Sequence, residues 1–131
     1  MAKSVVIKSF NNCFLDFLND VSTLYPLNKD IKSSLKSIEL LNRLNPTIVI
    51  KVWYSYIHKP YQSFIDMGDI SFFIEKNYKD DVSMISDSSE ILQVIDRIRE
   101  PISLMSDINR VHTMKHIQNL SKLSILYQNV H

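Results

Sequence analysis

The sequence predicts an all-α protein, folded as a single-domain bundle of about six helices around an apolar third helix. Apolar residues recur every three or four positions through most of the chain, and capping residues and prolines separate these periodic runs. A chain of 131 residues also lies in the usual range for one domain with one hydrophobic core. The alternative left open is an α+β fold with a small sheet that includes residues 47–57.

The first two helices are predicted from their apolar faces and from the residues between them. From residue 6 to residue 24 the apolar side chains share one helix face, and Pro26 ends the run. Asn28 is a suitable N-cap for a second helix. The apolar line of that helix, widened by its last two members, consists of Ile31, Leu35, Ile38, Leu41, Leu40 and Leu44.

The third segment, residues 47–57, is the ambiguous one, because its β-branched and aromatic residues suit a strand as well as a helix. The pair Asn45 and Pro46 favours a helix start, and the helical spacing continues past Pro60. We therefore predict a helix that Pro60 kinks or restarts and that Gly68 ends.

In the second half of the chain we expect a short turn of helix capped by Asp69, then a polar loop near residues 76–89. The next helix is capped within Asp87–Ser89 and kinked or ended by Pro101, and Asp107 caps the last helix. The apolar positions of the last helix are Ile108, Val111, Ile117, Leu120, Leu123 and Tyr127.

Composition argues against several classes of protein. The net charge is +1, so no overall field attracts the chain to nucleic acid or to an anionic membrane. The single cysteine, Cys13, cannot close an intramolecular disulfide, which favours a reducing compartment. No segment approaches the roughly 20 apolar residues of a membrane span. We expect an intracellular protein, in host cytoplasm, nucleus or virion interior if it is viral.

We predict no catalytic residues, no cofactor, no metal site and no small-molecule substrate. His112 and His116 stand four apart on one helix face, but Thr113 follows His112 where a metalloprotease motif requires glutamate. Pairs of carboxylates, such as Asp16 with Asp20, are more simply explained as caps and surface charges. A phosphate-binding loop needs several glycines, and the chain has one.

Two surfaces are candidates for binding. The third helix is apolar on nearly every side, so it is central or meets a partner. Its core face is predicted to hold Val49, Val52, Trp53, Tyr56 and Ile57. Its predicted protein interface, for a partner or a second copy, holds Ile50, Tyr54, Lys51 and His58. The alternative is a nucleic-acid surface on the second helix, formed by the stripe Lys29, Lys32, Lys36 and Arg43.

Short segments in the first 75 residues carry a resemblance. They are FLDFLNDVSTLYP at residues 14–26, Leu44-Asn45-Pro46, Pro60-Tyr61 with Ile65, and Asp69 with Phe72 and Phe73. These segments resemble small helical proteins of large nucleocytoplasmic DNA viruses, and the AT-rich coding that the composition suggests agrees with such an origin. Viral Bcl-2-like proteins are similar in size and architecture. The Asn-Trp-Gly-Arg signature of the cellular members of that group is absent here. The resemblance implies a viral origin, and no site or activity carries over from it. The absence of catalytic motifs and the apolar surface of the third helix predict a non-enzymatic interaction or structural protein that acts through a helical surface on a protein partner.

Overall fold

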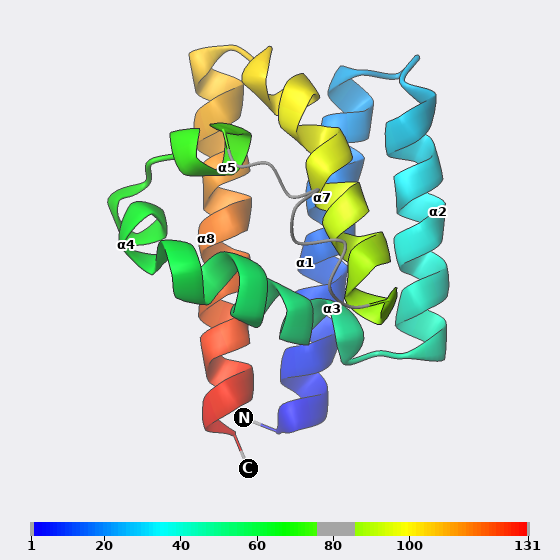
Figure 1. Ribbon diagram of the computed structural model, residues 1–131, viewed down its shortest axis with the longest axis vertical. Coiled ribbons are helices and arrows are strands. Elements are labelled where there is room, and N and C mark those ends of the chain that lie inside the picture. Colours follow the sequence, from blue (N-terminus) through cyan, green and yellow to red (C-terminus); the bar gives the residue numbers. More distant parts are fainter. Residues whose placement is uncertain (1, 76–85, 131) are drawn as a thin grey trace.

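The computed structural model describes residues 2–75 and 86–130, and all regular structure within them is helical (Figure 1). This confirms the all-α prediction and excludes the sheet alternative for residues 47–57. The helices are α1 (Lys3–Leu24), α2 (Lys29–Leu44), α3 (Ile48–Val52), η1 (Trp53–His58), α4 (Lys59–Met67), α5 (Ser71–Glu75), α7 (Ser86–Ser103) and α8 (Asp107–Asn129). In the described part of the chain, no helix is both long enough and apolar enough to cross a membrane.

Four long helices form the frame of the bundle. In Figure 1, α8, α1 and α2 stand side by side, and α7 passes in front of α1. The continuous segment formed by α3, η1 and α4 crosses this frame, and α3 contacts α1, α2, α7 and α8. The third helix is therefore central, as the sequence predicts. Both termini lie at the same end of the molecule (Figure 1).

Trp53 is the largest side chain in the core, and it is fully buried. Its indole Nε1 donates a hydrogen bond to Ser121 Oγ at 3.0 Å, so its one polar atom has a partner. The rings of Phe10, Phe14 and Phe73 pack around it at centroid distances of 6.1–6.5 Å. The predicted core face of the third helix is confirmed for Val49, Val52, Trp53 and Ile57, whereas Tyr56 is half-buried.

The third helix begins later than the sequence predicts and contains a π-helical turn. Asn45 follows the last residue of α2, and its side-chain oxygen accepts from the Thr47 hydroxyl at 3.2 Å instead of capping α3. In η1 the Lys59 amide bonds to the Tyr54 carbonyl, five residues back. This wider turn immediately precedes Pro60, where a regular helix loses a donor and clashes with the proline ring.

Three predicted helix signals are confirmed. Asn28 Oδ1 accepts from the Ile31 amide at 3.2 Å, which is an N-cap hydrogen bond. Gly68 ends α4 in the left-handed conformation with φ of 72°, and its amide and that of Asp69 bond back to carbonyls of the last turn. Asp69 Oδ1 accepts from the amide of Ser71, the first residue of α5, as expected for a cap.

Several predicted boundaries and faces are corrected. Ser106, and not Asp107, caps α8, because its hydroxyl accepts from the Asn109 amide at 3.3 Å. The helix α7 begins at Ser86, so residues 86–89 are helical; the rest of the predicted loop, residues 76–85, lies outside the described residues. The apolar positions Leu40, Leu44, Ile108 and Val111 are exposed, because each lies away from the side of its helix that packs on the bundle.

Candidate functional site

The predicted interface on the third helix is only partly at the surface. Ile50 is fully buried and His58 is 7% exposed, because α3 and η1 are covered by neighbouring helices. Neither side chain is available to a partner, which corrects that part of the prediction. Tyr54 is half-buried and stacks on His58 with ring centroids 5.5 Å apart, and Lys51 is exposed. The remaining surface of this helix is small and polar.

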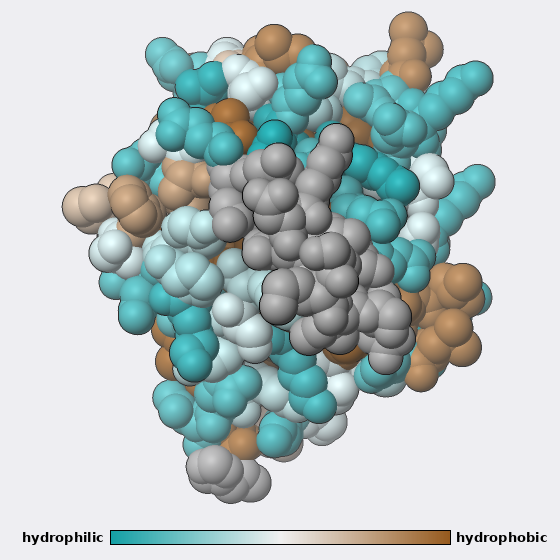
Figure 2. Space-filling view, in the orientation of Figure 1, coloured by the Kyte–Doolittle hydropathy of each residue, from teal (hydrophilic) through white to brown (hydrophobic). Residues whose placement is uncertain are grey.

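The basic stripe lies where the sequence predicts, on the outer face of α2. Lys29, Lys32, Lys36 and Arg43 are all exposed, and none of them pairs with a carboxylate among the described residues. Leu40 falls between Lys36 and Arg43 on this face and is 54% exposed, and Leu44 is 74% exposed. Hydrophobic atoms are visible in Figure 2 at the lower right, over the end of α2. This face of α2 therefore joins positive charge to apolar surface.

A groove of about 500 Å³ lies between α1 and α2, beside the stripe. Its lining from α1 follows one helix face in steps of three and four residues, and α2 and the turn after it complete the groove. The lining residues are Ser4, Ile7, Lys8, Asn11, Asn12, Leu15, Glu39, Asn42, Arg43 and Pro46. The α1 side spans residues 4–15, which is about 16 Å at the helical rise of 1.5 Å per residue. We refer to this feature as the α1–α2 groove.

The α1–α2 groove contains buried amide groups without partners. Asn11 is 9% exposed, and its Nδ2 donates to the Pro46 carbonyl at 2.9 Å, which ties the start of the third helix to α1. Its Oδ1 accepts no hydrogen bond from the described residues, and neither Oδ1 nor Nδ2 of Asn42 has a partner among them. Buried polar atoms are almost always hydrogen-bonded in folded proteins. Asn11 and Asn42 are exceptions within the groove, and outside it the described residues include four more, His58, Asp96, Arg99 and Arg110.

Charge in the α1–α2 groove is mixed, with an excess of cations. Lys8 comes from α1 and Arg43 from α2, and Glu39 is the one acidic residue in the lining. Apolar surface comes from Ile7, Leu15 and Pro46. The groove thus offers apolar contact, two cations and unpaired amides within one short stretch of surface.

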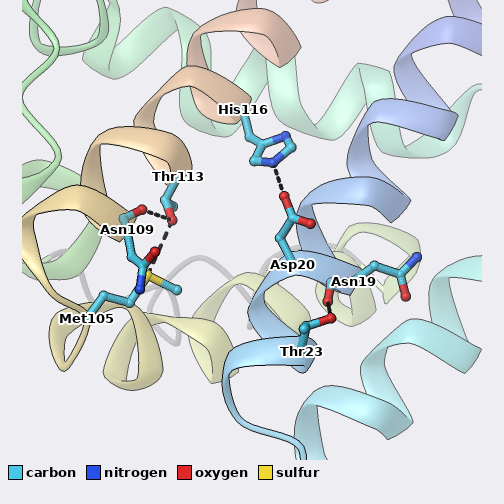
Figure 3. A network of polar contacts seen from close by, with 7 residues as sticks. All are labelled: Asn19, Asp20, Thr23, Met105, Asn109, Thr113 and His116. Atoms are coloured by element: carbon cyan, nitrogen blue, oxygen red, sulfur yellow. Dashed lines mark hydrogen bonds and ion pairs between the residues drawn. The ribbon is translucent and has the colours of Figure 1, made fainter.

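The two histidines of the last helix lie beside a second, smaller hollow of about 220 Å³ between α1 and α8. His116 Nε2 lies 2.5 Å from Asp20 Oδ2 (Figure 3). The His116 ring also stacks on Phe17. His112 lines the same hollow, and Thr113 donates to the Asn109 carbonyl at 2.9 Å. Within the described residues, no three His, Cys, Asp or Glu side chains are placed to hold a metal ion.

Cys13 and Asp69 have perturbed pKa values with simple structural causes. Burial, together with the nearby charge of Asp16, raises the pKa of the Cys13 thiol to about 11. The hydroxyl and amide of Ser71 donate to Asp69 and lower the pKa of that carboxyl. The Cys13 thiol is therefore a poor nucleophile at neutral pH, and Asp69 acts as a helix cap.

Comparison with known proteins gives no match: no family model, no curated protein and no solved structure is similar to this chain. The site therefore rests on geometry. The α1–α2 groove was not predicted from the sequence, although one signal was present. Asn11 stands midway between Ile7 and Leu15, so an amide interrupts an apolar line on the first helix.

Proposed function

We propose that this chain is a non-enzymatic interaction protein that binds a protein partner in the α1–α2 groove. The observation that carries the proposal is the pair of buried amides, Asn11 and Asn42, whose free polar atoms have no partner among the described residues. The viral origin implied by the resemblance is part of the proposal and rests on the sequence alone.

The energetics of the groove favour a bound partner. An unsatisfied buried donor or acceptor costs about 1–3 kcal/mol, and a ligand that pairs with it recovers much of this free energy on binding. A volume of about 500 Å³ suits a few side chains of a partner. The lining contains no histidine or cysteine, and among the described residues neither Ser4 nor Lys8 is paired with its one carboxylate, Glu39, so no nucleophile is joined to a base there. Binding, and not catalysis, is the chemistry that these side chains favour.

The experiment is to block the groove without disturbing the core. Asn12 is exposed and lines the groove, so Asn12→Trp fills it with a large side chain. Asn19→Trp is the matched control, because Asn19 is exposed on the same helix outside the groove. Peptides selected on the intact chain from a random display library should bind the control normally and lose at least tenfold in affinity for Asn12→Trp. Equal binding to both variants would refute the proposal.

The second candidate function is nucleic-acid binding by the basic stripe, favoured by the exposure of all four cations without acidic partners in the described residues. Each phosphate contact contributes about −0.9 to the slope of log affinity against log salt on duplex DNA. Charge reversal at Lys32 and Lys36 should therefore reduce the magnitude of this negative slope by about two if the stripe binds DNA. Retention on DNA that is unaffected by this variant would remove the candidate.

A further inference from the structure

We infer that the occupant of the α1–α2 groove is an extended, acidic peptide segment of the partner, and not a helix. This inference rests on the proposed function and adds the conformation and charge of the bound segment. It follows from three features of the groove: its unpaired amides, its length and its cations.

The amides distinguish an extended peptide from a helix. In a helical partner the backbone N–H and C=O groups are already paired along the helix, so they cannot satisfy Asn42. An extended segment has free groups of both kinds on its backbone. Asn42 can offer both a donor and an acceptor, and the soft terminal torsion of an asparagine side chain allows it to turn toward a ligand. Asn11 is held by the hydrogen bond from its Nδ2 to the Pro46 carbonyl, so the contact to the segment falls to Asn42.

The length of the groove sets the size of the segment. The face of α1 in the groove is about 16 Å long, and an extended chain advances about 3.3 Å per residue. About five residues therefore fill it. Side chains of an extended segment alternate in direction, so apolar side chains at alternate positions can contact Ile7 and Leu15. The side chains at the positions between them face the edges of the groove, where Lys8, Arg43 and Glu39 stand.

The charges at these edges select acidic residues. Lys8 and Arg43 stand on opposite sides of the groove, against one carboxylate, Glu39. Lys36 and Lys32 extend the positive surface along the neighbouring face of α2, and both are exposed. An acidic segment therefore gains charge-assisted hydrogen bonds at Lys8 and Arg43, and approaches a surface of complementary charge.

The test is a peptide array probed with the fluorescently labelled full-length chain. One set has Val, Ile, Leu or Phe alternating with Asp or Glu over about five residues, matched to the extended spacing. A second set replaces the acidic residues with Lys, a third carries N-methyl groups on the backbone, and a fourth consists of acidic amphipathic peptides that form helices. We expect binding to the first set, with losses of at least tenfold in the second and third sets and weaker binding to the fourth.

Two variants connect this binding to the groove. Asn42→Leu removes the unpaired amide, and Asn119→Leu, at an exposed site on α8, is its control. Arg43→Glu reverses a cation of the groove, and Lys115→Glu reverses an exposed cation on α8, outside both the groove and the stripe. Each groove variant should weaken binding of the first set at least tenfold while its control changes it less than threefold. Thermal melting confirms that all four variants are folded.

The outcomes separate the two proposals. Preference for the helical set, with loss of binding in Asn12→Trp, would overturn the extended conformation while the protein-binding function stands. Binding that N-methylation or Asn42→Leu leaves unchanged would also overturn the role of the amides. No saturable binding of the first set overturns the inference, and display peptides that ignore the Asn12→Trp block overturn the function itself.

Discussion

Truncation of Trp53 tests whether the third helix forms the centre of the core. The indole is fully buried, and it packs against Phe10, Phe14 and Phe73 from two other helices. Trp53→Ala removes these ring contacts and leaves a cavity where α1, α5 and α8 meet the third helix. It also removes the hydrogen bond of 3.0 Å that the indole N–H donates to the Ser121 hydroxyl.

The expected loss is large relative to the stability of a domain of this size. Removal of a buried Trp side chain typically costs about 3–5 kcal/mol. A domain is stable by about 5–15 kcal/mol, so this one substitution removes a substantial fraction of the total. At about 3–5 °C for each kcal/mol, the melting temperature should fall by roughly 10–20 °C.

Urea unfolding followed by circular dichroism measures this loss directly. Tyr54→Ala is the control, since Tyr54 is the adjacent aromatic residue, is half-buried and stacks mainly on His58. Its cost should be about 1 kcal/mol. If Trp53→Ala costs less than about 1 kcal/mol, or if both variants cost the same, the central placement of Trp53 is refuted.

Three further predictions concern single side chains. Burial lowers the pKa of His58 below 6.5, although the charge of Asp66 opposes the shift, so the stability that neutral His58 contributes is complete above pH 6.5 and declines below it. His58→Phe should therefore flatten the pH dependence of the urea unfolding free energy between pH 7.5 and 5, and an unchanged pH dependence would contradict this. Cys13 should react with a thiol reagent at pH 8 roughly 100-fold more slowly in the folded chain than in urea. Gly68→Ala should cost about 1 kcal/mol by calorimetry through its positive φ, since the nearest atom, on Gln118, is 3.7 Å from the added Cβ.

Local signals in the sequence predicted most of the fold because they act within one helix. Asn28 and Gly68 cap and end their helices through hydrogen bonds to residues at most five positions away. Such contacts depend on local sequence and need no knowledge of the tertiary structure. The errors at Asp107 and at the start of α7 are shifts of a few residues, where several neighbouring polar side chains are suitable caps.

Tertiary packing determines which helix faces are buried, and the local sequence does not show this. Ile50 and Tyr54 point away from the predicted core face, yet Ile50 is fully buried, because other helices cover more than one side of the segment. The π-helical turn at Trp53–His58 adds to this, since it changes the angular positions that regular helical spacing assigns to the following side chains. Conversely, Ile108 and Val111 are apolar and exposed, because they lie away from the side of α8 that packs on the bundle, where Thr113 and Met114 are buried.

Helix α1 carries both the core and the proposed binding groove, on different faces. Phe10 and Phe14 point into the core, whereas Ile7 and Asn11 line the groove. Asn11 connects the two regions through its hydrogen bond to the Pro46 carbonyl, and Ile7 and Leu15 of the groove also pack against the core. Substitutions at exposed groove positions should therefore change binding without changing stability, whereas Asn11 variants should change both. This separation makes the groove variants informative about function, because loss of binding at those positions cannot be attributed to loss of the fold.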